Sequence, residues 1–77
     1  MKQEEKELKP RIRVIRQLDN EGNLIKSIVT MNGRKHSIEG PAHREWEFDR
    51  LGQLKLTRKE YWLNGIEYTK DEWEELV

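Results

Sequence analysis

The two histidines are the first residues in this sequence whose type and spacing could support chemistry. His36 and His43 flank Gly40-Pro41, with Glu39 and Glu45 close by in the sequence. Imidazole and carboxylate groups are common ligands of zinc, so these residues could share a metal ion. A structural role for His36 in a turn and an exposed position for His43 explain the same residues without a metal. We therefore expect no metal site and no cofactor.

Two carboxylates form a second candidate. Glu45 and Glu47 are at positions i and i+2 of a predicted strand and so share one face, at about the separation that glycosidases use. A solvated strand offers no pocket that would raise the pKa of one carboxyl group, and Lys55 is expected opposite Glu47. The sequence has no P-loop, no glycine-rich fingerprint and no Ser/His/Asp arrangement. We predict that the protein is not an enzyme.

Basic residues near the start of the chain could hold phosphate or an acidic partner. Arg11, Arg13 and Arg16 follow Lys9 and would form a stripe along a strand. Arg16 is also expected to face Lys26 across a hairpin, and like charges opposite each other are unfavourable. Either an acidic partner relieves this repulsion, or this end of the sheet is solvated.

Aromatic residues are the remaining candidates for binding. Adjacent residues of a strand face opposite sides of a sheet, so Tyr61 and Trp62 point to different faces. If the Trp46 side is the core, one of these two rings is exposed on the other face unless the helix covers it. An exposed aromatic ring on a small sheet would serve as an interface anchor, although a core position is the more common explanation for each ring taken singly. The predicted partner-binding residues are Arg11, Arg13, Arg16, Trp46, Tyr61 and Trp62.

Composition limits the class of protein that can carry these residues. The chain has 77 residues, 15 of them basic and 15 acidic, so its formal net charge is zero, which argues against nucleic-acid binding driven by bulk charge. With 39% charged and 34% hydrophobic residues, the core must be thin. There is no cysteine, no signal-peptide pattern and no apolar run approaching the roughly 18 residues of a membrane span. We predict a soluble, cytoplasmic protein without membrane contact.

Four turn sequences at regular spacing predict how the chain folds. Asp19-Asn20-Glu21-Gly22 and Asp49-Arg50-Leu51-Gly52 each place Asp first and Gly fourth, a composition that closes a hairpin with a left-handed glycine. Asn32-Gly33 and Asn64-Gly65 each supply two positive-φ residues, as a type I′ turn requires. The alternation predicts a mainly β protein, an antiparallel β-meander of two repeated hairpin units with a short C-terminal α-helix.

The turns also predict the strand register. Placing Gly22 on Gly52 makes the two units copies of one element of roughly thirty residues. The strand over residues 42–48 is expected to direct Ala42, Trp46 and Phe48 inward. The expected apolar cross-strand pairs are Leu18 with Leu24, Val14 with Ile28, Phe48 with Leu54 and Trp46 with Leu56.

The two ends of the chain have different signatures. Residues 1–9 are almost wholly charged and predict a flexible tail, which leaves residues 10–77 as a single domain. Thr69 followed by Glu72 is a capping box, so a helix is expected over residues 70–76. Such a short helix is marginal alone, and Trp73 should pack against the sheet.

Several of these motifs resemble a known repeat family. Asn32-Gly33-Arg34-Lys35-His36 followed by Glu39-Gly40-Pro41-Ala42 resembles the NGK-H-R-x-D/E-GPA core of MORN-like repeats, which are common in phage and giant-virus proteins. Leu51-Gly52-Gln53-Leu54 and Tyr61-Trp62-Leu63-Asn64-Gly65 resemble the second half of that repeat. Ser37 departs from the pattern, which has Arg after the histidine. The resemblance implies a β-hairpin array used for interaction, with no catalytic residues to carry over.

We therefore predict a non-enzymatic protein-binding module. The viral source that the resemblance implies would make an inhibitor of a host defence protein an expected role. The alternative is a nucleic-acid or nucleotide-binding protein that uses a basic stripe and an aromatic platform. A second copy of the chain could also pair with an exposed edge strand to form a homodimer.

Overall fold

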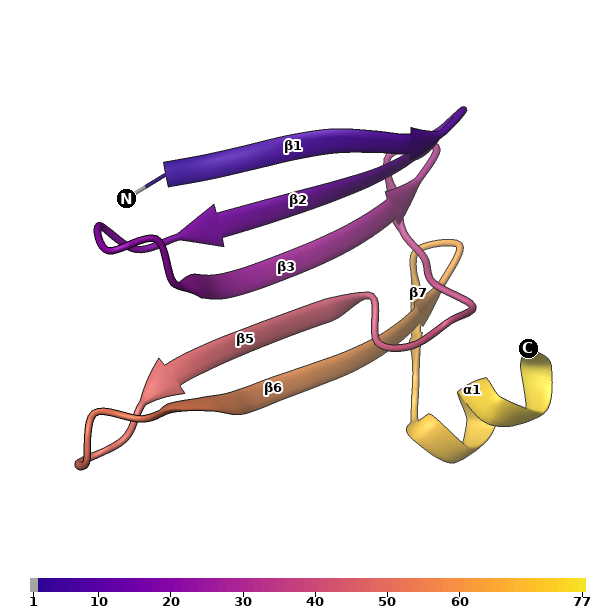
Figure 1. Ribbon diagram of the computed structural model, residues 1–77. Helices are drawn as coiled ribbons and strands as arrows, with labels where there is room; N and C mark the ends of the chain where they lie inside the picture. Colours follow the sequence, from indigo (N-terminus) through magenta and orange to yellow (C-terminus); the bar gives the residue numbers. More distant parts are fainter. Residues whose placement is uncertain (1) are drawn as a thin grey trace.

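The computed structural model describes residues 2–77, and Met1 lies outside the described residues. Within that range the chain forms one antiparallel sheet and one helix (Figure 1). The elements are β1 (Lys2–Lys9), β2 (Ile12–Leu18), β3 (Leu24–Met31), β4 (Arg34–Lys35), β5 (His43–Phe48), β6 (Leu54–Leu63), β7 (Ile66–Tyr68) and α1 (Lys70–Leu76). The strand order is β1-β2-β3-β5-β6-β7, with β4 paired to β3. The predicted fold class, a meander of two hairpin units with a short C-terminal helix, is confirmed.

The two Asp-x-x-Gly turns close the β2–β3 and β5–β6 hairpins. The glycine N–H donates to the aspartate carbonyl at 3.1 Å in both turns, and Gly22 and Gly52 have φ of 87° and 76°. Oδ1 of Asp19 and of Asp49 accepts the N–H groups two and four residues later, each at 2.9 Å. These hydrogen bonds lower the pKa of both aspartates. The largest contribution comes from the N–H of Asn23 for Asp19 and from the N–H of Gln53 for Asp49.

The two Asn-Gly turns start the short return strands β4 and β7. Asn32 and Gly33 have φ of 54° and 78°, and Asn64 and Gly65 have φ of 50° and 81°. Both residues of each turn are therefore left-handed, as the type I′ prediction requires. The return strand pairs only with the last residues of the strand before it, so most of that strand's edge is left for another partner.

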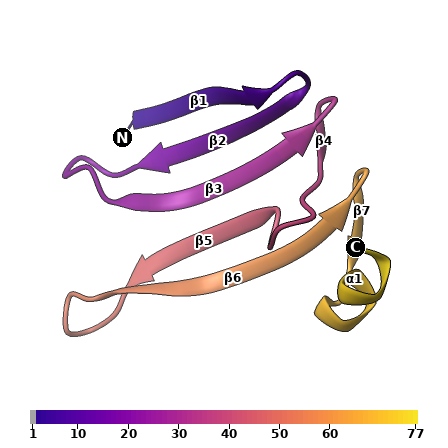
Figure 2. The same cartoon turned by 45° about the vertical axis from the view of Figure 1, so that its right-hand side comes forward.

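The second unit pairs with the part of the β3 edge that β4 leaves open. β2 occupies one side of β3, while β4 pairs with Thr30 and Met31 on the other side. On that same side β5 pairs with residues 26–28, which joins the two units into one sheet (Figure 2). Bonds from Ser37 N–H to the Trp62 carbonyl and from Ala42 N–H to the Glu60 carbonyl reinforce the junction.

The prediction of a flexible tail is wrong for the part of it that the structure describes. β1 runs antiparallel to β2 over its whole length. The turn at Pro10-Arg11 connects the two strands, and Arg11 has φ of 72° in it. Glu4 lies opposite Arg16, Glu7 lies opposite Arg13, and Glu5 forms an ion pair with Arg13 at 3.2 Å. Opposite charges across neighbouring strands stabilise a pairing that the composition of β1 alone disfavours.

The predicted register holds near the turns and fails in the first hairpin beyond a β-bulge. Leu18 lies opposite Leu24 as expected, but Ile25 is an extra residue, so Gln17 faces Lys26 and Val14 faces Val29. Arg16 consequently lies opposite Ser27 rather than Lys26, and the predicted repulsion is absent from this pair. The second hairpin keeps the expected pairs up to Trp46 with Leu56, beyond which Thr57 forms its own bulge.

The sheet has almost no enclosed core. Among the described residues, the buried apolar side chains are Ala42 and Trp73, and no side chain is fully enclosed. The molecule measures 38 × 28 × 15 Å. The shortest dimension, 15 Å, corresponds to a single sheet with a helix at one end (Figure 1). Two expectations for β5 are wrong: His43 is buried at 4% exposure, and Phe48 is 51% exposed. The alternation was predicted correctly, but within residues 2–77 no second layer covers the sheet.

Candidate functional site

The two faces of the sheet differ in chemistry. The helix face, named for α1, lies on the side where the Trp73 ring packs 5.0 Å from the Tyr61 ring. Alternation and register assign residues to each face. The helix face carries Val14, Arg16, Val29, Arg44, Trp46, Phe48, Leu54, Leu56, Lys59 and Tyr61. The charged face carries Arg13, Ile15, Ile28, His43, Glu45, Arg58, Glu60 and Trp62.

A charge network occupies the centre of the charged face. The buried His43 ring contacts Glu45 Oε2 through Nε2 at 2.7 Å, and its Nδ1 lies 3.8 Å from Glu60 Oε1. Arg58 joins the two carboxylates, at 3.0 Å from Glu45 and through a close ion pair with Glu60. The hydrogen bond with His43 is the main reason why the pKa of Glu45 is lowered.

Glu60 is the centre of this network. Its side chain is 10% exposed and accepts the Trp62 indole N–H at 2.9 Å, while the Lys35 ammonium lies at 3.6 Å. Lys35 also lies 4.8 Å above the Trp62 ring, a cation–π distance. Burial opposes ionisation of Glu60, but hydrogen bonds from Trp62 and Arg58 outweigh it, and the pKa of Glu60 is lowered.

The network joins β4, β5 and β6, and both of its carboxylates already have partners, whereas His43 Nδ1 is buried without a hydrogen-bond partner among the described residues. Each carboxylate is held ionised by neighbouring donors, so neither is set up as a proton donor near neutral pH. This cluster was not predicted from the sequence, because His43 was expected to be exposed to solvent. The signal available in the sequence is polar residues at alternating positions, 43 and 45 on one strand and 58 and 60 on the next, followed by Trp62 with its indole N–H donor.

The helix face presents an open apolar patch, which we call the aromatic patch. It consists of Trp46 and Phe48 from β5 with Leu56 and Leu54 opposite them on β6. Phe48, Leu54 and Leu56 are 51%, 37% and 42% exposed, and Trp46 is half-buried. No described element covers these side chains, since α1 packs at the other end of the strands (Figure 1). Apolar groups gathered in this way are typical of an interaction surface.

A row of basic residues crosses the helix face beside the aromatic patch, and we call it the cationic row. Cross-strand register places Arg16, Ser27, Arg44 and Lys59 next to one another on β2, β3, β5 and β6. Glu4 on β1 ends the row. The ion pairs and side-chain hydrogen bonds recorded for residues 2–77 do not involve Arg16, Arg44 or Lys59. Arg44 and Lys59 are available to an anionic group, and Arg16 faces Glu4 on the neighbouring strand without an ion pair within 4.0 Å.

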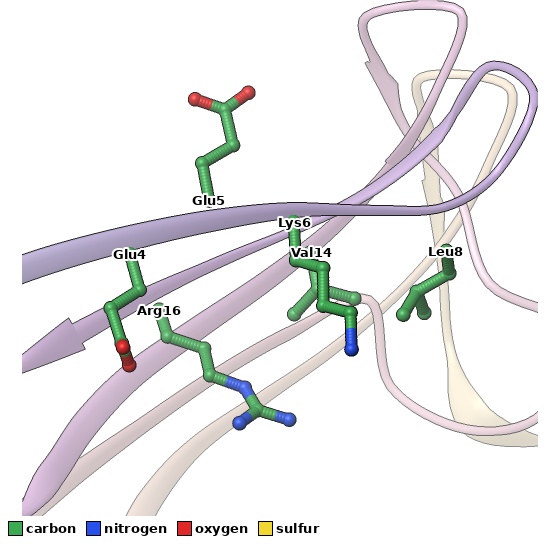
Figure 3. A pocket seen from close by; sticks show the side chains of 6 residues that line it. All are labelled: Glu4, Glu5, Lys6, Leu8, Val14 and Arg16. Atoms are coloured by element: carbon green, nitrogen blue, oxygen red, sulfur yellow. The ribbon is translucent and has the colours of Figure 1, made fainter.

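Two hollows lie at the β1 end of the helix face. In Figure 3, Glu4, Lys6 and Arg16 point to the helix-face side of β1 and β2, whereas Glu5 points away. A second hollow is mainly apolar and lies between Leu8 on β1 and Ile38 in the β4–β5 connection. It is lined by Leu8, Lys9, Ile12, Val29, Met31, His36, Ser37, Ile38 and Glu39. The apolar character of this face thus extends well beyond the aromatic patch.

The structure does not bring the six predicted binding residues together. Arg16 and Trp46 lie on the helix face, and Tyr61 lies there too but packs against Trp73. The remaining three are placed elsewhere: Arg13 is on the charged face in an ion pair, Trp62 is in the charge network, and Arg11 is in a turn. The predicted basic stripe is therefore divided between two faces, because alternate residues of a strand point in opposite directions.

Comparison with known proteins finds no match to this chain, either among family models or among curated proteins and solved structures. In the part of the chain that the structure describes, no helix is long and apolar enough to cross a membrane. Any functional assignment must accordingly come from the two faces themselves and from the motifs in the sequence.

Proposed function

We propose that this protein is a non-enzymatic protein-binding module that docks its partner on the helix face. The observation that supports this most directly is the uncovered aromatic patch. Complete burial of a phenylalanine is worth roughly 1.5–3 kcal/mol, and Phe48, which is 51% exposed, still leaves about half of that energy unused. A partner that covers the patch would recover that energy.

The dimensions of the molecule support the same proposal. The chain exposes 5896 Å², whereas a compact monomer of 9.4 kDa exposes about 5000 Å². The excess of about 900 Å² is close to the roughly 800 Å² that each partner contributes to a standard interface. The radius of gyration, 13.4 Å, likewise exceeds the about 11.5 Å expected for 77 compact residues.

Within this class, an inhibitor of a host defence protein is the role that the resemblance to phage repeat proteins favours. Such an inhibitor needs only a binding surface and no chemistry of its own. The charge network fits a non-enzymatic module, because its carboxylates are held in ion pairs that stabilise the sheet.

The cationic row supports a second candidate function, binding of single-stranded nucleic acid. Phosphates would contact Arg16, Arg44 and Lys59, and a base would stack on Trp46. Two features weigh against it. The chain has no net charge, and the acidic residues of α1, Asp71, Glu72, Glu74 and Glu75, lie at the end of the same face.

Affinity capture with matched variants tests the proposed face. The immobilised protein is exposed to lysate of its native cell, and captured partners are identified and then purified for binding measurements. Phe48→Ser with Leu56→Ser should weaken binding of the purified partner at least tenfold, because both side chains project from the patch. Leu51→Ser is the control, since Leu51 is 83% exposed in a turn outside the patch.

Equal binding by all variants, each checked for its fold by circular dichroism, would contradict the proposal. Binding of an oligothymidine with steep salt dependence would favour the second candidate function instead.

A further inference from the structure

The outer edge of β6 is unpaired over most of its length. β5 pairs with Leu54–Glu60 on one side, and β7 lies on the other side but pairs only with residues 61–63. Every residue from Leu54 to Lys59 is exposed. No described strand therefore occupies the outer edge of β6 before Tyr61.

Backbone groups on this edge point outward in a regular order from Leu54 to Leu56, where the bulge at Thr57 interrupts the alternation. Asp49 N–H donates to the Gln53 carbonyl, so residues 49 and 53 are a hydrogen-bonded pair. Such pairs alternate along an antiparallel ladder, which makes Glu47 and Lys55 the next bonded pair. Leu54 and Leu56 consequently direct their N–H and C=O groups away from β5. These groups can bond with another extended chain.

The first unit shows what fills the equivalent edge. In β3 the return strand β4 covers residues 30 and 31, and the antiparallel strand β5 covers residues 26–28. In β6 the return strand β7 is present, but a strand equivalent to β5 is missing from residues 2–77. The same backbone geometry is therefore occupied once in the fold and open once.

Side chains on β6 define what the added strand must carry. Leu54 and Leu56 lie on the helix face, whereas Lys55 and Arg58 lie on the charged face beside Glu47 and Glu45. Lys59 adds an unpaired cation on the helix face. Lys55 already forms an ion pair with Asp49 at 3.4 Å, and Arg58 forms ion pairs with Glu45 and Glu60, but both side chains are more than half exposed and can contact a further carboxylate. A complementary strand therefore alternates apolar residues beside the leucines with acidic residues beside Lys55 and Arg58.

These cations also exclude one occupant. Two β6 edges paired antiparallel would bring Lys55, Arg58 and Lys59 of one copy against the same residues of the other. Like charges opposite each other destabilise a pairing, and charged edge residues are a common protection against self-association. The edge thus favours an acidic strand over a second copy of itself.

We propose that the outer edge of β6 between Leu54 and Lys59 binds an extended, acidic and apolar segment of a partner protein as an added antiparallel strand. This inference rests on the proposed function, because it assigns the partner's chemistry and its mode of attachment beside the aromatic patch. Main-chain bonds provide affinity and the alternating side chains provide specificity.

A peptide of alternating glutamate and valine, nine residues long, is the probe for this edge. Nuclear magnetic resonance hydrogen exchange should show at least tenfold slower exchange of the Leu54 and Leu56 amides when the peptide is added. The same peptide N-methylated at alternate amides keeps its side chains but cannot pair along its backbone, and should give no protection. Lys55→Glu with Lys59→Glu should weaken peptide binding by about tenfold. Lys6→Glu, the same charge change on β1, should leave binding unchanged.

Other outcomes would overturn the inference in distinguishable ways. Equal binding of the N-methylated peptide without amide protection would show side-chain docking only, which leaves the helix-face proposal intact. Protection of both amides in the protein alone, rising with its concentration, would assign the edge to a second copy. Absence of binding by either peptide would remove the edge site. Charge-reversal variants that weaken oligothymidine binding but not peptide binding would assign the cations to nucleic acid.

Discussion

Glu60 shows how a single side chain connects the two repeat units. Its carboxylate accepts the Trp62 indole N–H and contacts Lys35 and Arg58, so β4 and β6 meet at one group. His43 from β5 lies on its other side. Such a network is stable only while the carboxylate is ionised, because the protonated form loses its attraction for both cations.

Acid should therefore destabilise the protein through Glu60 and Glu45. The pKa of each is lowered in the folded state, so the stability they contribute is present above their unfolded pKa of about 4.3 and is lost as the pH falls through the folded value. Urea unfolding at pH 7, 5 and 3 should show a decrease in the free energy of unfolding below about pH 4.

Glu60→Gln should reduce this pH dependence and lower stability at pH 7 by about 1 kcal/mol, because neutral hydrogen bonds replace charged ones. Glu75→Gln, an exposed residue of α1, serves as the control with little change at either pH. An unchanged acid profile in Glu60→Gln would show that other carboxylates determine it.

At the scale of elements, β1 shows that charge can form a strand where composition predicts a tail. All eight of its residues are exposed, and they contribute little hydrophobic burial. Its position depends on backbone pairing with β2 and on glutamates placed opposite Arg13 and Arg16. These contacts join residues on either side of a turn that contains Arg11 with positive φ, a conformation that sequence rarely signals for arginine.

Deletion of residues 1–9 should test the contribution of β1. The shortened chain loses the cross-strand charge pairs and exposes the edge of β2, so its free energy of unfolding should fall by about 1–3 kcal/mol. Thermal unfolding followed by circular dichroism measures the change. An unchanged melting temperature would mean that the segment behaves as a tail in solution. Lys70→Ala, at the other end of the chain, provides a control for loss of one surface ion pair.

The C-terminal helix is the element that local sequence specified most completely. Thr69 Oγ1 accepts the Glu72 N–H at 3.2 Å, and Glu72 Oε1 accepts the Thr69 N–H at 3.0 Å. The predicted capping box is therefore present. Docking of α1 depends on tertiary contacts, through the Trp73 ring against Tyr61 and its indole N–H on the Ser37 carbonyl at 2.8 Å.

At the scale of the whole molecule, a single layer of sheet leaves one face without a partner. The helix face should therefore bind anilinonaphthalene sulfonate, an apolar anionic dye, in the folded state. The aromatic patch supplies apolar contacts, and Arg44 and Lys59 lie close enough to attract the sulfonate.

Phe48→Ser with Leu56→Ser should reduce the dye fluorescence at least severalfold, whereas Leu51→Ser should leave it unchanged. Sedimentation in the same buffer reports whether copies of the chain associate. Equal fluorescence in all three proteins would show that the patch is not the open apolar surface.

The lack of a second layer over the sheet also explains why some of the predicted binding residues lie in different surroundings. Alternation along each strand was readable, and it correctly required Tyr61 and Trp62 to face opposite sides. The sequence does not state which face receives a cover. α1 covers Tyr61, the charge network holds Trp62, and Phe48, expected inside, is exposed because no second layer packs on it.

By itself, the sequence determined the turns, the helix cap and the register next to each turn. Asp-x-x-Gly and Asn-Gly restrict backbone dihedral angles within four residues, so their outcome depends on little else. The tertiary structure alone decided the bulges at Ile25 and Thr57, the pairing of β1, and the meeting of His43 with Glu60. No short motif encodes these features, because their free energies depend on which strands become neighbours and in which register.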